Sequence, residues 1–168
     1  KRLNPQLYLL SEEAKKALKE SSDIKCIEYI EPDHEVQAFY RPDDTEYARQ
    51  WAHSAVQSEA AWDLVRDSSS ILIAVIDTGI DYRHPDLRSN LWINPGEVEG
   101  NGKDDDGNGY IDDVYGWDFA HGDADPMADD LPSFHGTHVA GIIGARGDNG
   151  LGVCGHSPRA QIMALKFL

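Results

Sequence analysis

A short, unbroken apolar run in the middle of the chain ends directly on an acidic residue. Residues 71–76 are all apolar, and Asp77, Thr78 and Gly79 follow them. The run is too short for an ordinary helix and is rich in β-branched side chains, so it predicts a strand that is buried on both faces. Asp77 then lies at the carboxyl end of this strand, where open α/β sheets build their functional sites.

A histidine opens the second informative stretch of the sequence. His135 is followed by a segment of small residues, which predicts a helix over residues 136–145. Four small residues would let this helix pack closely on a sheet, which offsets the low helix propensity of the glycines: Gly136, Ala140, Gly141 and Gly144. A carboxylate at a strand end and an imidazole at a helix start are two parts of a charge-relay site, so Asp77 and His135 are the candidate catalytic residues.

Two further elements complete the expected framework. Residues 58–65 predict a short helix with Trp62 facing inward, and residues 160–168 predict another buried strand. At most a few strands are therefore expected in this chain, with apolar faces left uncovered. The two cysteines, Cys26 and Cys154, are too few for a disulfide scaffold, and both are interpreted as small buried hydrophobic residues.

The charge of the chain argues against one class of partner. A formal net charge of -15 and a pI near 4.6 leave no basic patch that could neutralise phosphates, so nucleic acid is not an expected partner. No apolar run reaches the length needed to cross a bilayer, and no membrane partner is expected. No signal peptide is visible in these residues.

Acidic residues crowd the long segment of residues 88–134, and such crowding needs cations to hold it together. Asp104, Asp106 and Asn108 alternate and Gly109 follows, which is the first half of an EF-hand calcium loop with glycine at the sixth position. At the twelfth position Tyr115 stands in place of the bidentate Glu. The candidate calcium ligands are Asp104, Asp106, Asn108, Tyr110 through its carbonyl, Asp112 and Asp113.

The first two motifs resemble those of the subtilisin-like serine peptidases. Residues 75–81 with 84–87 are similar to the family's aspartate motif, and residues 135–141 are similar to its histidine motif, in the family's order Asp, His, Ser. The resemblance implies an α/β fold with a partial doubly wound parallel sheet of the subtilisin type. It also implies a secreted or extracytoplasmic serine endopeptidase that cleaves polypeptide substrates, with Asp77 orienting His135 as the general base.

The third motif of that family, a Gly-Thr-Ser-type segment that carries the nucleophile, is not found between His135 and Leu168. Ser157 is the only serine in that stretch, and it lacks the small flanking residues of such a motif. We therefore expect the nucleophile beyond Leu168, and we expect these residues alone to be inactive.

The N-terminal part resembles the last half of the α+β inhibitory propeptide of the same family. Residues 11–20 predict a helix, and residues 24–30 predict a strand. The resemblance divides the chain into a partial propeptide, residues 1–40, and the N-terminal part of a catalytic domain, residues 41–168. Such a propeptide is an intramolecular chaperone and inhibitor, so the protein is expected to be a zymogen with its own propeptide as a partner. Cleavage is expected after Ala38 or after Tyr40.

The resemblance adds calcium ligands outside the acidic loop, and several family members carry a similar Asp-rich insertion. Asp86 matches a calcium ligand of the family, and Asp44 matches one in thermostable relatives, where the same ion ties down the N-terminal arm. Residues 148–153 would complete that site through either Asp148 or Asn149. A further trio forms either another site or plain surface acids: Asp118, Asp123 and Asp125.

Two other functions compete with this interpretation. In a metallohydrolase, His135 and His138 at positions i and i+3 would bind zinc together with Asp77. The sequence near them offers no further His or Cys cluster with ligand spacing, which disfavours zinc. A non-catalytic calcium-binding or inhibitory module is the second alternative, because the nucleophile is missing from these residues.

Overall fold

Two units make up the chain, Lys1–Ala38 and Phe39–Leu168. The computed structural model describes residues 11, 13, 16, 17, 20, 40–128 and 134–168. In the first unit, the described residues from 13 to 20 are helical, as expected for the helix over 11–20. The expected strand over 24–30, Cys26 and the cleavage position after Ala38 lie outside the described residues, so the propeptide stays a prediction.

The helices and strands of the second unit include all those expected. In chain order they are the 3-10 helix η1 (Tyr47–Arg49), α2 (Trp51–Ala55), α3 (Ser58–Leu64), β1 (Leu72–Asp77), β2 (Gly116–Asp118), α4 (His135–Gly144) and β3 (Gln161–Lys166). The sequence did not predict η1, α2 and β2. The expected helices over 58–65 and 136–145 and the expected strand over 160–168 are confirmed, with ends shifted by one or two residues. None of the described helices is both long and apolar enough to span a membrane.

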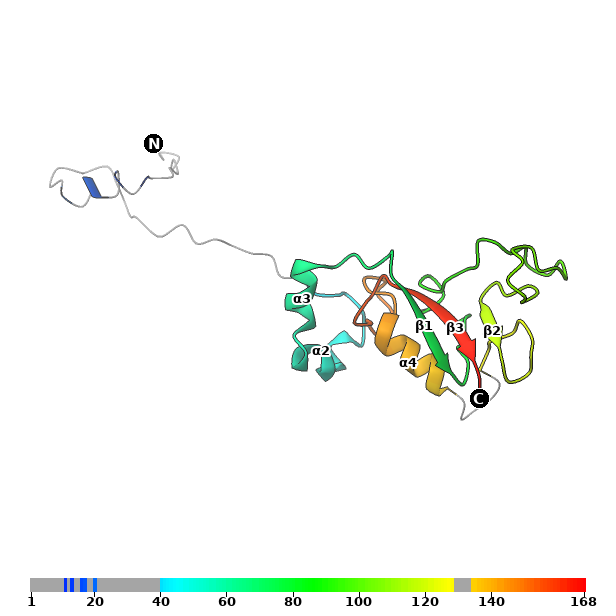
Figure 1. Cartoon of the computed structure of the whole chain (residues 1–168). Helices are drawn as coiled ribbons and strands as arrows, with labels where there is room; N and C mark the ends of the chain where they lie inside the picture. The colour runs from blue at the N-terminus through cyan, green and yellow to red at the C-terminus, as the bar shows by residue number, and fades with distance from the viewer. Residues whose placement is uncertain (1–10, 12, 14–15, 18–19, 21–39, 129–133) are drawn as a thin grey trace, which may run out of the picture. The chain divides into compact units, whose positions relative to one another are not determined.

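The described strands form a parallel sheet in the order β1-β3-β2 (Figure 1). Asp77 ends β1, Lys166 ends β3 and Asp118 ends β2, and the register places Lys166 between the two acids. Because the strands are parallel, their three carboxyl ends meet at one edge of the sheet. The expected α/β fold with a partial parallel sheet is confirmed.

Helix α4 packs against β1 and β3 and covers one face of the sheet. Its small residues permit this close approach at both ends. A Cβ at Gly136 would overlap the carbonyl oxygen of Gly79, and one at Gly144 would lie 2.8 Å from Cδ1 of Ile162. Gly141 has no atom within 4 Å of such a position, so the expectation that it serves the packing is wrong. The core beneath α4 consists of Val75, Ile80, Leu87, Leu91, Ala140, Ala145, Ile162 and Ala164.

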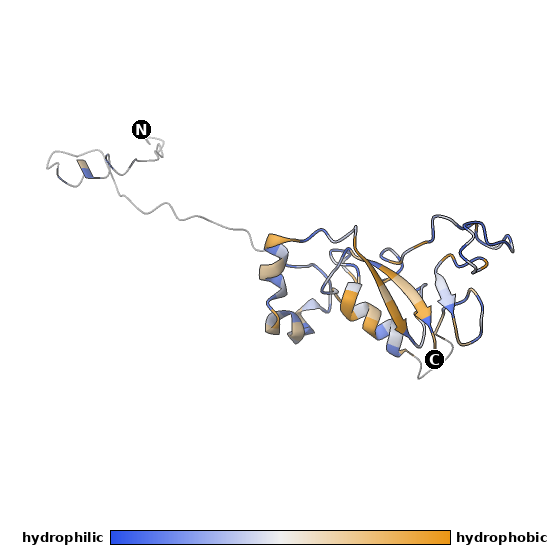
Figure 2. Cartoon of the chain, in the orientation of Figure 1, coloured by the Kyte–Doolittle hydropathy of each residue, from blue (hydrophilic) through white to orange (hydrophobic). Residues whose placement is uncertain are grey.

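The opposite face of β1 is open in the described chain. Leu72 and Ile76 are 45% and 62% exposed, whereas Val75, which points to the other face, is 5% exposed. Figure 2 shows apolar colouring along β1, β3 and α4. The prediction that β1 is buried on both faces is therefore wrong for this chain, because α4 covers only one of them. The expectation that apolar faces are left uncovered is confirmed.

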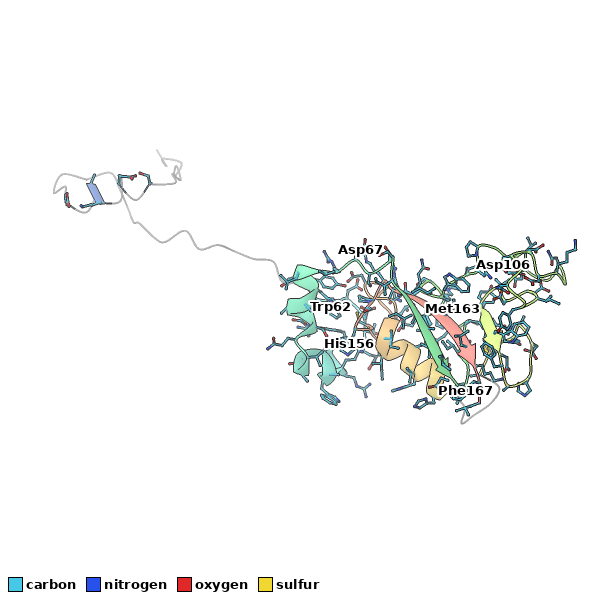
Figure 3. All side chains as sticks on the ribbon, viewed as in Figure 1. Trp62, Asp67, Asp106, His156, Met163 and Phe167 are labelled. Carbon is cyan, nitrogen blue, oxygen red and sulfur yellow. The ribbon has the colours of Figure 1, made fainter. Side chains whose placement is uncertain are left out.

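A second, smaller core lies beneath the N-terminal arm, which we define as residues 40–64. Trp62 of α3 is 5% exposed and packs with Tyr47 and Cys154, so its inward orientation is confirmed. The Trp62 indole Nε1 donates a hydrogen bond to the backbone carbonyl of His156 at 2.9 Å, and Figure 3 labels both residues. Cys154 is a buried free thiol, as expected.

The start of β2 gives a test of the sheet's close contacts. Gly116 has φ +123°, and a Cβ there would overlap the backbone carbonyl of Ala164 on β3. Gly116→Ala is expected to lower the free energy of unfolding by about 3 kcal/mol or more, since neither backbone can give way. Gly122→Ala is the matched control, because Gly122 also has positive φ, +75°, but faces open space. It should cost only about 1–2 kcal/mol. Urea unfolding measures both losses, and equal losses would contradict the steric account.

Candidate active site and acidic clusters

Asp77 and His135 face each other where β1 ends and α4 begins. Nδ1 of His135 lies 2.8 Å from each carboxylate oxygen of Asp77. Because a carboxylate only accepts, Nδ1 carries the proton of the neutral ring, and Nε2 is its unprotonated nitrogen. The side chain of His135 is 71% exposed and that of Asp77 is 16% exposed, so the imidazole is open to solvent while the carboxylate is mostly covered. The structure thus brings the two candidate catalytic residues together.

Hydrogen bonds from backbone N–H groups to threonine hydroxyls join the two motifs and hold this pair in place. The Gly136 N–H donates to Thr78 Oγ1 at 3.1 Å, and the Asp81 N–H donates to Thr137 Oγ1 at 2.9 Å. These bonds tie the first turn of α4 to the residues just after β1. The orientation of His135 therefore follows from the backbone on both sides of the contact and not from its own side-chain bond alone.

Two opposing effects act on the Asp77 carboxyl. Burial pushes its pKa up, but hydrogen bonds from the Thr78 backbone N–H and from His135 outweigh burial and hold the pKa below its usual value. The Thr78 N–H lies 2.7 Å from Oδ1. Asp77 is therefore ionised at neutral pH and can stabilise a positive charge on His135.

The protein family of the chain is shown by a match to a family model. The model of the subtilase family, Peptidase_S8, matches residues 68–168, which include both Asp77 and His135. The chain belongs to the subtilase family. The family resemblance of the aspartate and histidine motifs is thereby confirmed.

Individual relatives agree with this assignment. The chain is 42% identical over 132 residues to Subtilisin-like protease 1 of Plasmodium vivax, a match that covers 77% of this chain and 20% of that protein. It is 34% identical over 130 residues to thermitase of Thermoactinomyces vulgaris, covering 77% of this chain and 37% of that protein. A solved protease structure from Pseudoalteromonas arctica matches with a TM-score of 0.50 at 27% identity, over 74% of this chain and 38% of that chain. The chain spans well under half the length of each relative, and the fold is of the subtilisin type.

Zinc binding at the Asp77–His135 pair gains no support within the subtilase fold. Among the described residues, the groups of three or more potential metal ligands include none of Asp77, His135 and His138. His138 is exposed on α4, while Nδ1 of His135 is bonded to Asp77. The side chains that a metallohydrolase would need do not converge here.

The neighbouring strand ends hold a buried ion pair. Lys166 Nζ lies 2.8 Å from Asp118 Oδ2, and these side chains are 1% and 2% exposed. Nδ1 of His121 approaches the same oxygen at 2.8 Å. Burial pushes the pKa of Asp118 up, but Lys166, His121 and backbone N–H groups lower it to about 2. Asp118 is thus not a surface acid, and a lysine already neutralises it, which disfavours a metal site shared with Asp123 and Asp125.

One acidic group joins the N-terminal arm to the loop of residues 148–156, which we call the 148–156 loop. Asp43, Asp44 and Asp148 offer oxygens that all lie within 4.8 Å of one another. The Asp148 N–H donates to Asp44 Oδ2 at 3.1 Å, and the Gly150 N–H donates to Asp43 Oδ1 at 3.1 Å. We call Asp43, Asp44 and Asp148 the arm cluster. It brings the predicted ligand Asp44 together with Asp148, one of the two residues that the sequence left open.

Asp86 is held by the same loop. It is 3% exposed and accepts hydrogen bonds from Asn149 Nδ2 at 2.7 Å and from the Val153 N–H at 2.9 Å. Asp44 is 5% exposed, and among the described residues its Oδ1 has no hydrogen-bond partner. Burial first of all, and also the charge of Asp86, raises the pKa of Asp44, although backbone N–H groups oppose this. Buried carboxylates of like charge with an unsatisfied oxygen suit a hard cation that prefers oxygen ligands.

The acidic loop gathers two of its six predicted ligands, Asp106 and Asp113, into one cluster. Asp106 and Asp113 place carboxylate oxygens within 4.8 Å of each other and of Glu97. Asn108 Nδ2 donates to both aspartates at 3.1 Å. We call Glu97, Asp106 and Asp113 the loop cluster, and Figure 3 labels Asp106 within the acidic loop.

Two other predicted ligands of the loop, the carboxylates of Asp104 and Asp112, are turned toward its backbone. Asp104 accepts the N–H groups of Asn108 and Gly109 at 3.0 and 2.9 Å, which lower its pKa. Asp112 accepts those of residues 101 and 102 at 3.0 and 2.9 Å. The ring of Tyr110 packs against Trp117 with 4.9 Å between ring centroids. These contacts shape the loop, and the sharp bend at Gly109 has the positive φ, +96°, that the EF-hand pattern predicts.

Sequence reasoning missed Glu97. Its Oε1 accepts the N–H groups of Asp105 and Asp106 at 2.9 and 3.1 Å, and its Oε2 accepts that of Asp112 at 3.1 Å. Glu97 precedes the EF-hand pattern, so ligand spacing does not point to it. The sequence feature that could have pointed to Glu97 is its position directly after a Pro-Gly turn at residues 95 and 96 and shortly before the acidic run.

The buried Lys166–Asp118 pair gives a pH-dependent prediction. Lys166→Met is expected to lower the free energy of unfolding at neutral pH by about 3–5 kcal/mol, because it leaves a buried charge without its cation. The pKa of Asp118 is about 2 in the fold and 3.8 ordinarily, so the pair's stabilisation is present above the ordinary value and is lost as the pH falls toward 2. The loss in free energy of unfolding caused by Lys166→Met should therefore be smaller at about pH 3 than at neutral pH.

Urea unfolding at neutral and acidic pH measures this cost. The double variant Lys166→Met/Asp118→Leu is the control, because removing both charges should recover most of the loss at neutral pH. A loss that is the same at both pH values, with no recovery in the double variant, would show that lost packing and not the unpaired carboxylate is responsible.

Proposed function

We propose that the protein is a serine endopeptidase whose Asp and His are Asp77 and His135 of this chain. The observation that carries this proposal is the contact of His135 Nδ1 with both carboxylate oxygens of Asp77 at 2.8 Å, in a chain of the subtilase family. The proposal requires a nucleophilic serine and an oxyanion donor in addition, because residues 135–168 contain no Gly-Thr-Ser-type segment. The substrates are polypeptides.

Each step of the proposed reaction uses the geometry of this pair. Asp77 accepts the Nδ1–H of His135 and so keeps Nε2 unprotonated. Nε2 takes the proton of the serine hydroxyl as that oxygen attacks the peptide carbonyl, and the imidazolium then delivers the proton to the leaving amine. Asp77 stays ionised throughout, because its pKa is lowered, and it stabilises the imidazolium.

The protein is further proposed to be a secreted zymogen, with residues 1–40 or slightly fewer as the end of its inhibitory propeptide. The contacts of Tyr40 support cleavage after Ala38 and not after Tyr40. Its hydroxyl donates to Asp148 Oδ2 at 2.8 Å, its N–H donates to Asp63 Oδ1 at 3.2 Å, and the Arg66 guanidinium lies 4.2 Å from its ring centroid. A residue so tied to the second unit belongs with the mature enzyme.

Calcium is the proposed cofactor, held at the arm cluster beside Asp86 and at the loop cluster. Both clusters offer only oxygen ligands, which calcium prefers. The buried, unpartnered Oδ1 of Asp44 supports the first of them. The ion would neutralise carboxylates that the chain has no described lysine or arginine to pair with, and it would fix the arm and the acidic loop.

Two substitutions test the catalytic assignment. In the full-length protein, with a peptide substrate, Asp77→Asn is expected to lower kcat about 10⁴-fold and His135→Ala about 10⁶-fold, as at other triads of this kind. Asp81→Asn is the matched control from the same motif and should retain activity, because its carboxylate accepts the Arg83 N–H, which an asparagine oxygen can also do.

Inhibitors separate the proposal from the zinc alternative. A serine-directed phosphonate should abolish activity, and a zinc chelator in the presence of excess calcium should not. Activity that survives both the phosphonate and the His135→Ala substitution would overturn the peptidase proposal.

Calcium removal tests the proposed cofactor. In the inactive His135→Ala background, which prevents self-digestion, a chelator should lower Tm and calcium should restore it. Calcium at about 100 times its Kd should stabilise the protein by about 3 kcal/mol per site. Asp44→Asn and Asp106→Asn should each remove part of this gain, whereas the exposed control Asp67→Asn should keep all of it. A Tm indifferent to calcium would contradict both sites.

A further inference from the structure

A cluster of two imidazoles and a hydroxyl lies between the N-terminal arm and the 148–156 loop, apart from the Asp77–His135 pair. Ser58 Oγ lies 3.0 Å from His53 Nδ1 and 2.9 Å from His156 Nδ1. The two rings have 4.3 Å between their centroids. Ser58 is only 4% exposed, so this hydroxyl is not placed to attack a substrate.

The partners of these groups fix the direction of each hydrogen bond. Nε2 of His53 lies 2.8 Å from the carbonyl oxygen of Cys154, which only accepts, so Nε2 carries the ring proton. Nδ1 of a neutral His53 is then an acceptor, and the Ser58 hydroxyl donates to it. Ser58 Oγ in turn accepts the Nδ1–H of His156. The chain of bonds is satisfied when both imidazoles are neutral.

Protonation of both imidazoles disrupts this chain. A single added proton can be accommodated, because the Ser58 hydroxyl can accept the Nδ1–H of a charged His53 and donate to Nδ1 of His156. With both rings charged, each Nδ1 carries a proton, the Ser58 hydroxyl proton loses its acceptor, and two positive rings have only 4.3 Å between their centroids. His53 is 3% exposed, so water cannot supply a replacement partner without movement of the arm. In the part of the chain that the structure describes, no carboxylate is paired with either imidazole.

The surrounding charges offer little compensation. The ring of Tyr47 of η1 is tilted against that of His53, with 5.1 Å between ring centroids, and its hydroxyl donates to Glu59 of α3. The buried Cys154 thiol lies on the loop side. His53 and His156 also line a cavity of about 680 Å³, whose other titratable and charged lining groups are Arg49, Asp81, His84, Asp86 and His138.

The environment of His156 opposes its charged form. Burial, and after it the neighbouring His53, lowers the pKa of His156 below its ordinary 6.5. Because the unfolded chain takes up this proton first, the stability that depends on the neutral ring is complete above the ordinary value. It is lost progressively as the pH falls below that value.

The same two segments meet again at the arm cluster. Gln50 exchanges two hydrogen bonds with the backbone of Cys154, at 2.9 and 2.8 Å, and the Glu46 N–H donates to the Gly152 carbonyl at 2.7 Å. Glu46 and Gln50 lie between Asp44 of the arm cluster and His53 in the sequence of the arm. An arm that leaves the loop at the histidines therefore loosens the contact that assembles the carboxylates.

We propose that His53, Ser58 and His156 form a proton-operated latch between the N-terminal arm and the 148–156 loop. At neutral pH the latch is closed and holds the arm cluster together. In acid, protonation of both imidazoles opens it and weakens cation binding at that cluster. The coupling is reciprocal, so a bound cation also makes the latch harder to protonate. The inference rests on the proposed cation site and not on the peptidase activity.

His156→Asn tests the latch, because the asparagine amide can donate to Ser58 in place of Nδ1–H but does not titrate. The full-length protein is used with and without this change, in the His135→Ala background. Calcium Kd and Tm are measured at about pH 7.5 and about pH 5.5. On acidification the protein with His156 should lose about fivefold more calcium affinity than His156→Asn. Its Tm should fall by about 4 °C more.

Controls separate the latch from general acid effects. His138→Asn removes an exposed histidine that lines the same cavity and should keep the full acid response. Ser58→Ala breaks the chain of bonds and should weaken calcium binding at both pH values. Identical acid losses with and without His156→Asn would overturn the latch. An acid loss of Tm that depends on His156 without any calcium binding would overturn the coupling and, separately, the proposed cation site.

Hydrogen exchange gives a readout that needs no substitution in the latch. After correction for the intrinsic effect of pH, amides of residues 46–58 should exchange faster in acid, and added calcium should slow them. Arm amides that keep the same protection at both pH values would overturn the latch even where His156→Asn fails to fold.

Discussion

The close approach of α4 to the end of β1 is the contact on which the rest of this structure depends. Gly136 lies against the carbonyl of Gly79, where a side chain on Gly136 would clash. This contact lets His135 reach Asp77 while the body of α4 covers the core face of the sheet. The same helix therefore serves stability through its buried small residues and the proposed chemistry through its first residue. Neither role is possible at a larger separation, because the hydrogen bond to Asp77 needs a heavy-atom distance near 3 Å.

Carboxylate charge is neutralised in two different ways in this acidic chain. At the sheet edge, Asp118 has an internal cation, Lys166, and its pKa falls to about 2 despite burial. At the arm cluster, burial raises the pKa of Asp44, and one of its oxygens lacks a hydrogen-bond partner among the described residues. The first arrangement is complete within the chain, and the second is suited to a cation from solution. Opposite shifts of chemically identical groups thus distinguish a structural ion pair from a proposed metal site.

The N-terminal arm is held to the body by polar junctions at two places, the arm cluster and the histidines. Tyr47, Trp62 and Cys154 form only a small apolar core between them. The arm cluster and the histidine latch close the same interface, so they share the free energy that keeps the arm in place. Carboxylates without protons favour a cation, and neutral imidazoles favour the closed hydrogen-bond chain. Acid acts against both, which is the physical reason for expecting them to be coupled.

The sequence by itself determined the elements that carry the site. Asp77 and His135 stand in short local patterns, an apolar strand ending in an acid and a small-residue helix opened by a histidine, and such patterns depend only on neighbours in the chain. The bend at Gly109 was predictable for the same reason. Tertiary structure alone decided that Glu97 joins Asp106 and Asp113, that Lys166 neutralises Asp118, and that His53 meets His156. It also decided that α4 covers one face of β1 and leaves the other open. These outcomes depend on contacts between segments far apart in the sequence, and residue spacing carries no record of where a folded loop or helix finally lies.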